Sequence, residues 1–150
     1  MSFEKMKKLK KWQFYVLSFT WGLPLSLAGA VVCLTLLLAG GKPQKYGHCY
    51  YVAAGKNWGG FSMGWFFLVD KNAPIRTKDH EMGHGYQNAC KYGPFTVMLT
   101  LISVCRYWYD RLIKRINYEA YFFEKEASEL GKYIFDGSEG GKYENIQSKS

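Results

Sequence analysis

Two shortages limit the chemistry that this 150-residue chain can support. Its four cysteines are Cys33, Cys49, Cys90 and Cys105, and no two of them form C-x-x-C, which excludes a zinc knuckle or redox pair of that type. Nothing in the sequence favours a Cys49–Cys90 disulfide over two free thiols. The chain also has only three histidines, so a pair of them at metal-binding spacing is informative.

A third absence is charge between Trp12 and Gly41. As a helix this run would be about 45 Å long, more than the roughly 30 Å hydrocarbon core of a bilayer requires. Pro24 is expected to kink the helix or to mark its entry into the core. Because cleaved signal peptides have shorter apolar stretches, we expect an uncleaved single-pass transmembrane helix; cleavage near Ala28 or Ala30 is the alternative.

The formal net charge of +8 is explained in large part by lysines just before this anchor. By the positive-inside rule they predict a cytoplasmic N-terminus, an outward-facing remainder and contact with anionic lipid. The chain lacks the aromatic-basic pattern of a nucleic-acid fold, so we expect a lipid bilayer and no nucleic acid as partner. The lysines are Lys5, Lys7, Lys8, Lys10 and Lys11.

The rest of the chain predicts a single α+β domain. Residues 1–41 form the basic N-terminus and anchor, 42–135 a small antiparallel hairpin or sheet followed by a helical zinc-binding domain, and 136–150 a disordered polar tail. Strands are predicted over 48–54 and 61–69.

Three helices are expected after the strands. Thr77 or Asp79 is predicted to cap the first, which ends near Lys91. Residues 92–105 are uncharged but only about 21 Å long as a helix, which favours a buried or partly membrane-inserted segment. The last helix is predicted from Tyr118 to about Phe135.

The residues His80-Glu81-Met82-Gly83-His84 read H-E-x-x-H. In a helix the two histidines share one face, about one turn apart, and can hold one Zn²⁺. Glu81 directly follows the first histidine and can act as the general base toward a water on the metal. The alternative is a polar helix face that carries these residues by chance.

A catalytic zinc needs a third protein ligand. His48 lies far upstream, whereas several carboxylates on the last helix are better placed. The small residue Ala127 would let that helix approach the H-E-x-x-H helix closely. The candidate carboxylates are Glu119, Glu124, Glu126 and Glu129.

With H-E-x-x-H followed by a later E-x-x-A, the chain resembles the gluzincin class of zinc metallopeptidases. It is similar in particular to small bacterial membrane-anchored gluzincin-like proteins, which share G-K-x-W-G-G, H-E-x-G-H-x-x-Q-N, G-P-F, R-Y-W-Y and Y-[DE]-A-x-x-F-E-x-x-A-[ST]-x-x-G. The matching segments are residues 55–60, 80–88, 93–95, 106–109 and 118–131.

This resemblance implies a zinc held by His80, His84 and Glu124, with Glu81 as general base. It also implies that a peptide pairs with a hairpin strand beside the active-site helix. Many gluzincins carry an aspartate four residues after the third ligand, where it supports a ligand histidine. This chain has Ser128 at that position.

The sequence therefore predicts a membrane-anchored zinc metallopeptidase acting on peptides or proteins, with Tyr118 or Tyr121 as candidates for stabilising the oxyanion. One alternative is a catalytically inactive zinc-binding membrane protein that binds a partner or has a structural role. Another is a membrane-interaction protein without metal. If 92–105 crossed the bilayer, His80 and Glu124 would lie on opposite sides, so the zinc hypothesis requires that this segment does not span.

Overall fold

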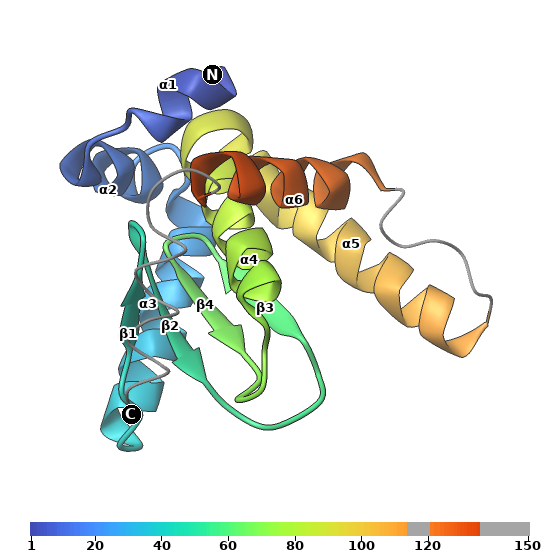
Figure 1. Cartoon of the computed structure of the whole chain (residues 1–150). Coiled ribbons are helices and arrows are strands. Elements are labelled where there is room, and N and C mark those ends of the chain that lie inside the picture. Colours follow the sequence, from blue (N-terminus) through green and yellow to red (C-terminus); the bar gives the residue numbers. More distant parts are fainter. Residues whose placement is uncertain (114–120, 136–150) are drawn as a thin grey trace.

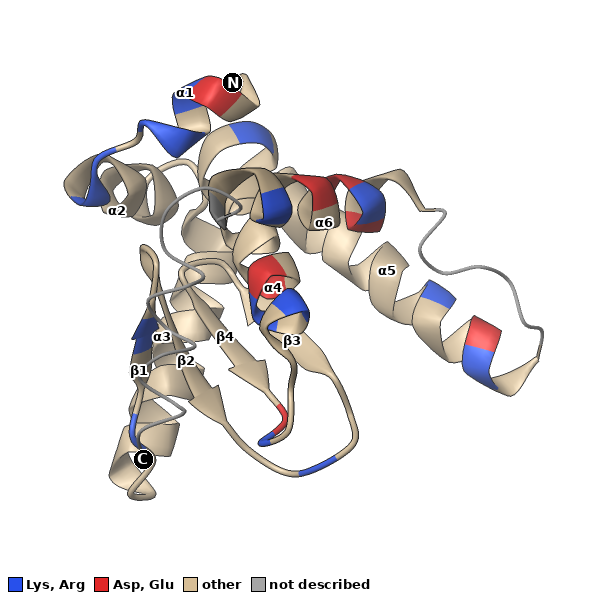
Figure 2. Ribbon diagram, in the orientation of Figure 1, with Lys and Arg blue, Asp and Glu red and all other residues tan. Residues whose placement is uncertain are grey.

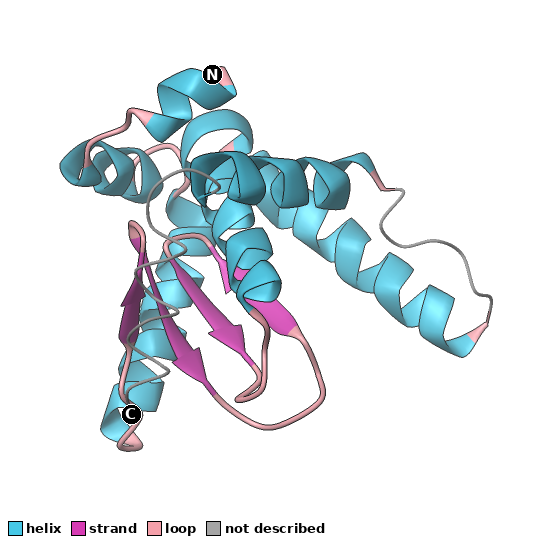
Figure 3. Cartoon of the chain, viewed as in Figure 1, coloured by secondary structure: helices cyan, strands magenta, loops and turns pink. Residues whose placement is uncertain are grey.

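The computed structural model describes residues 1–113 and 121–135, which form an α+β fold (Figures 1 and 3). Six α-helices, a π-helical turn and four strands follow in chain order. They are α1 (Phe3–Lys7), α2 (Lys11–Phe19), α3 (Leu23–Leu38), β1 (Gln44–Tyr46), β2 (Cys49–Ala53), β3 (Gly60–Met63), β4 (Phe66–Val69), α4 (Ile75–Gln87), η1 (Asn88–Tyr92), α5 (Phe95–Leu112) and α6 (Phe122–Phe135).

The four strands form one mixed sheet in the order β1-β2-β4-β3. The predicted strand over 61–69 is two strands, because Gly64 adopts a φ of +71° and turns the chain back on itself between β3 and β4. That reversal makes β4 run parallel to β2, so the prediction of a purely antiparallel hairpin is wrong. β3 lies at the edge of the sheet.

Helices cover both faces of the sheet, as the alternation of side chains along β4 shows. Phe67 and Val69 belong to a core cluster that includes Met82 of α4. Phe66, from the opposite face, packs in a second cluster with Cys33 of α3. The sheet is therefore a middle layer between α3 and α4, and α6 packs on α4 (Figure 1).

The uncharged N-terminal run forms two helices and not one continuous helix over 12–41, and whether it crosses a membrane stays a prediction. Pro24 lies in the first turn of α3, as its effect on a helix predicts, and α2 and α3 meet at 102°. The Asn88 side chain stabilises the break by donating to the Gly22 carbonyl and the Ser26 hydroxyl, both at 3.1 Å. Within the described ranges, no helix taken singly has the length and apolar character to cross a membrane, and only the bent α2–α3 pair meets that criterion together.

The helix that carries H-E-x-x-H begins earlier than predicted. Pro74 is extended and precedes Ile75, the first residue of α4, so neither Thr77 nor Asp79 is the cap. Asp79 instead accepts a 2.6 Å hydrogen bond from the Tyr46 hydroxyl. The continuous helical stretch of α4 and η1 ends before Gly93, as the Gly-Pro pair predicts.

The two later helices also differ from the prediction. α5 extends to Leu112 and much of its surface is exposed, so the expectation that this segment is buried within the protein is wrong, and partial insertion in a membrane stays a prediction. α6 begins at Phe122, and Tyr118, Glu119 and the predicted disordered tail 136–150 lie outside the described residues.

Candidate metal centre

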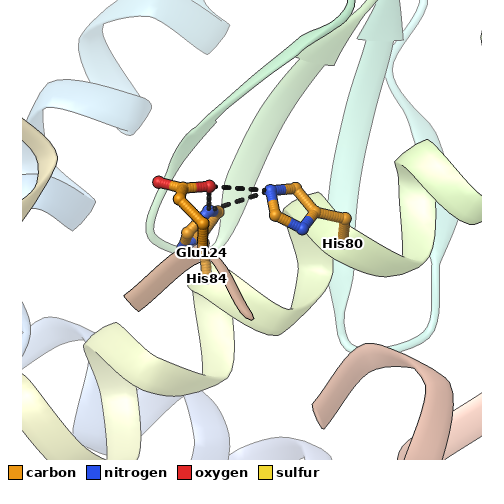
Figure 4. Close-up of side chains that lie close together, drawn as sticks. All are labelled: His80, His84 and Glu124. Atoms are coloured by element: carbon orange, nitrogen blue, oxygen red, sulfur yellow. Dashed lines mark hydrogen bonds and ion pairs between the residues drawn. The ribbon is translucent and has the colours of Figure 1, made fainter. Parts of the chain in front are cut away.

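Three side chains from two helices converge where the α4 and α6 helices cross (Figure 4). His80 and His84 lie one turn apart on α4, and Glu124 lies in the first turn of α6. The Nε2 atoms of the two imidazoles are 3.2 Å apart, and Glu124 Oε2 lies 3.0 Å from the first and 3.1 Å from the second. Glu124 is 3% exposed. The sequence-predicted ligand set is thus brought together as a cluster that can hold a metal ion.

The separations between these three atoms match those of a metal's ligands. Two ligand atoms about 2.0–2.1 Å from a tetrahedral centre are roughly 3.3 Å from each other. The three observed distances of 3.0, 3.1 and 3.2 Å fall just inside that value. Two imidazole nitrogens and one carboxylate oxygen are donors that bind divalent metal ions in proteins.

The hydrogen bonds of Gln87 determine which nitrogen of His84 faces the cluster. Gln87 Nε2 donates to the Phe123 carbonyl at 3.0 Å and to Glu126 at 2.9 Å, which fixes the orientation of the amide. Gln87 Oε1 must then accept the 2.9 Å hydrogen bond from His84 Nδ1. In the neutral ring the proton is therefore on Nδ1, and Nε2 directs a lone pair at Glu124. A lone pair facing a carboxylate calls for a cation between them, which is either a metal ion or a proton added to Nε2.

Ser128 supports the other histidine. Its hydroxyl lies 2.8 Å from His80 Nδ1, in the position that the family resemblance assigns to an aspartate. The serine supplies the hydrogen bond that orients the ring without supplying a negative charge. The outer nitrogens of both histidines are thus held, which is the arrangement that fixes ring orientation in metal sites.

The carboxylate of Glu124 is held in its charged form. Burial alone would raise the pKa of Glu124, but the two histidines and the Ser103 hydroxyl favour the anion and hold this pKa well below its usual range. Ser103, which belongs to α5, donates its hydrogen bond to the second carboxylate oxygen, Oε1. The other oxygen, Oε2, therefore remains directed at the histidines.

Close contact between α4 and α6 makes this geometry available. A Cβ added at Gly83 would lie 2.1 Å from the Ala127 carbonyl oxygen, so only glycine fits there. Ala127 is fully buried, which bears out the expectation that a small residue lets the two helices approach. A Cβ at Gly131 would similarly lie 2.1 Å from the Asp79 carbonyl oxygen. Small residues on both helices thus set the distance between Glu124 and the histidines.

Glu81 lies beside the cluster but is not one of its members. It is 5% exposed and packs against Gly60 of β3, where an added Cβ would come within 2.6 Å of Glu81 Oε1. Burial raises the pKa of Glu81 to about 7; the nearby His80 lowers it and Glu124 raises it. A carboxyl group with a pKa near neutrality is suited to exchange protons at physiological pH.

A cavity of about 210 Å³ lies between the edge strand β3 and α5 and reaches the cluster. Glu81 and the three cluster residues line one side of it. The remaining walls are largely apolar and come from α3, β3, α5 and α6. They include Leu25, Phe61, Val104, Tyr107 and Phe123.

Other candidate residues lie elsewhere. His48 contacts the Tyr86 hydroxyl and stacks on Phe14, so the third histidine packs against core residues and not in the cluster. Glu126 pairs with Lys91 and Glu129 with Lys125. Tyr121 lies under the guanidinium of Arg106, with the charge 5.3 Å from its ring centre, and nothing places its hydroxyl in the cluster. All four cysteines are free, so the structure contains no Cys49–Cys90 disulfide.

Gln87 and Ser103 are supporting residues that the sequence did not single out as such. Gln87 follows His84 by three positions, a helical spacing that could have revealed its contact with the ring. Ser103 had no such signal, because its contact depends on how α5 packs.

Comparisons with protein-family models, curated proteins and solved structures find no significant match to this chain. A functional proposal must therefore be based on the geometry of the site.

Proposed function

We propose that this protein is a zinc-dependent metallopeptidase. The observation that carries the proposal is the convergence of His80, His84 and Glu124 at tetrahedral ligand spacing, with the buried Glu81 next to them. A structural site has no use for a carboxyl group between two ligand histidines. The resemblance to gluzincins supports the same assignment.

The proposed roles divide between metal and protein. Bound zinc would supply a Lewis acid that polarises a carbonyl and acidifies water. Glu81 would take the proton from the attacking water and pass it to the leaving amine, because its pKa near 7 suits both transfers. Gln87 and Ser128 would hold the imidazoles, and Ser103 would hold the Glu124 carboxylate, so that the three ligands keep their geometry.

The position of β3 suggests how a peptide would bind. As the edge strand it lines the cavity beside the cluster, and an extended peptide can add to such an edge through main-chain hydrogen bonds. The apolar walls of the cavity, among them Phe61 and Val104, favour a substrate with an apolar side chain next to the cleaved bond.

The test compares wild type with Glu81→Gln on a mixed peptide library, read by mass spectrometry, with metal content measured in parallel. We expect about one zinc per chain in both proteins and a loss of cleavage of roughly 10²-fold or more in the variant. Glu129→Gln is the matched control, because Glu129 is exposed on α6 and should leave cleavage unchanged.

Two results would contradict the proposal. Absence of zinc after supplementation would remove the metalloprotein assignment, and equal cleavage by wild type and Glu81→Gln would remove the general base. If the zinc-loaded wild type cleaves nothing, the non-enzymatic zinc-binding alternative replaces the peptidase.

A further inference from the structure

The exposed face of α5 is apolar over the whole length of the helix. A helix on the surface of a water-soluble domain directs polar residues outward and apolar ones inward. In α5 the buried positions include Thr96 and Ser103, whereas Leu101 is 61% exposed. The exposed stripe recurs at helical spacing and consists of Phe95, Met98, Leu101, Ile102, Cys105, Trp108, Tyr109 and Leu112.

The same inversion occurs in α3, which carries no charged residue (Figure 2). Its buried positions include Ser26 and Gly29, where it packs on the sheet. Pro24, Ala28 and Thr35 are exposed, but six of its outward positions are large and apolar. They are Leu23, Leu27, Val31, Leu34, Leu37 and Leu38.

These two apolar faces begin close to each other. The indole of Trp21, just before α3, lies against Gly93, just before α5. Leu25 of α3 and Thr100 of α5 line the same cavity. The exposed apolar faces of α3 and α5 thus meet near the starts of the two helices and separate toward their ends.

Neither helix is separated from the part of the protein that holds the metal cluster. The inner face of α3 packs in a core cluster with Met63 and Phe66 of the sheet. α5 donates the Ser103 hydroxyl to Glu124. The chain before α3 also packs on this part of the protein, because Met6 is fully buried and Lys7 donates to the Tyr133 carbonyl of α6 at 3.2 Å.

Charges and aromatic residues at the edge of this surface fit anionic lipid. Basic residues lie at the start of α2 (Figure 2), where Lys10 is the N-cap and Lys11 the first residue. The next residue, Trp12, is 63% exposed. On α5, Trp108 is followed by Arg111. Tryptophan beside basic residues is typical of the boundary between lipid and water, and lysines near an anionic surface strengthen binding.

We propose that the outer faces of α3 and α5 insert into one leaflet of an anionic lipid bilayer, and that the N-terminus and the metal cluster lie on the same side of it. The protein then lies on the membrane and does not cross it. This differs from the topology expected from the sequence, in which the anchor separates a cytoplasmic N-terminus from an outward zinc domain. Neither test below depends on zinc or on peptide cleavage.

The first test measures binding of the purified full chain to phosphatidylcholine vesicles with and without phosphatidylglycerol. Wild type should co-sediment with the anionic vesicles. The variant Leu27→Asp/Leu101→Asp should bind about tenfold or more weakly, because each change removes a large apolar side chain from lipid. Both positions are more than half exposed, so circular dichroism and thermal unfolding should match wild type.

Phe122→Asp is the control for added negative charge, since Phe122 is 55% exposed but lies on α6, which packs on α4 and not on α3. It should bind like wild type; a loss equal to that of the double variant would overturn the proposal.

A maleimide reagent gives a readout that needs no mutation, because anionic vesicles should slow the labelling of Cys105 on the exposed apolar face of α5. Unchanged labelling of Cys105 would also overturn the proposal. So would a stable dimer that does not bind vesicles, because the apolar surface would then be the interface with a second copy of the chain.

The second test examines topology in right-side-out and inverted membrane vesicles of the expression host. In a Cys105→Ser background, single reporters Ser2→Cys and Asn72→Cys occupy exposed positions before and after α3. Both should be labelled from the same side, and the background without reporters should stay unlabelled. Labelling of the two reporters from opposite sides would show that α3 crosses the bilayer and would refute the proposal.

Discussion

Gln87 Oε1 lies 2.9 Å from Nδ1 of His84, on the same helix and one turn further along the chain. The other nitrogen of that ring lies 3.1 Å from Glu124. Because Gln87 also donates to the Phe123 carbonyl and to Glu126, its amide cannot turn without losing two further hydrogen bonds. A residue outside the cluster therefore determines that, in the neutral ring, the His84 nitrogen facing Glu124 carries the lone pair.

Replacing Gln87 by methionine should weaken zinc binding without removing a ligand. The Gln87→Met side chain has a similar length but cannot accept the Nδ1 proton, so we expect zinc affinity to fall by roughly 10- to 100-fold. Competition with a chromophoric chelator measures this. Tyr92→Phe is the matched control, because it removes the 2.8 Å hydrogen bond to the same Glu126 without touching His84. Equal zinc affinity in wild type and Gln87→Met would show that Gln87 does not set the tautomer.

Two substitutions of Ser128 should change zinc affinity in different directions. Ser128→Ala removes the hydroxyl 2.8 Å from His80 Nδ1 and should lower zinc affinity by up to about tenfold. Ser128→Asp introduces a negative charge next to His80, so it should bind zinc at least as tightly as wild type. The same chelator competition ranks the three proteins. The order would be wrong if the aspartate variant bound zinc no better than the alanine variant.

The sequence predicted the parts of the site that depend on local spacing. Two histidines four residues apart must share a helix face, and Ala127 indicated the close approach of the last helix. Among the carboxylates of that helix, only the resemblance to gluzincins selected Glu124. These inferences needed no knowledge of how the sheet or the N-terminal helices are arranged.

The features that the sequence did not predict depend on contacts between distant residues. The break between α2 and α3 is stabilised by Asn88, which lies 66 positions from Gly22. β2 and β4 pair in parallel because the chain turns back at Gly64. In the sequence, residues 61–69 look like one mostly apolar strand, so this turn was not predicted. The hydroxyl of Ser103 reaches Glu124 only because α5 packs beside α6.

Gly83→Ala should destabilise the fold, although alanine is the better helix former by up to about 1 kcal/mol. The added Cβ would lie 2.1 Å from the Ala127 carbonyl oxygen, and a backbone atom can move away only if α4 and α6 separate. We expect a loss of roughly 1–3 kcal/mol in the free energy of unfolding, measured in urea, together with weaker zinc binding. Glu129→Ala, a change at an exposed position of α6, is the control and should alter neither quantity. Unchanged or increased stability in Gly83→Ala would mean that the helices are not in close contact at this point.

The raised pKa of Glu81 predicts how the stability of the metal-free protein depends on pH. Burial raises the pKa of Glu81 from 4.5 to about 7, so between these values the folded chain keeps a proton that the unfolded chain has lost. The free energy of unfolding should therefore fall as pH rises from about 4.5 to 7, by on the order of 3 kcal/mol from this group. Glu81→Gln cannot ionise and should lose this part of the dependence, whereas Glu129→Gln should retain it. Urea unfolding across this pH range in the presence of a chelator measures the difference between each variant and wild type. The contrary result would be a difference in the free energy of unfolding between wild type and Glu81→Gln that does not change with pH. The Glu81 carboxyl group would then be solvated in the folded protein, and it would not be the buried acid that the proposed proton transfer requires.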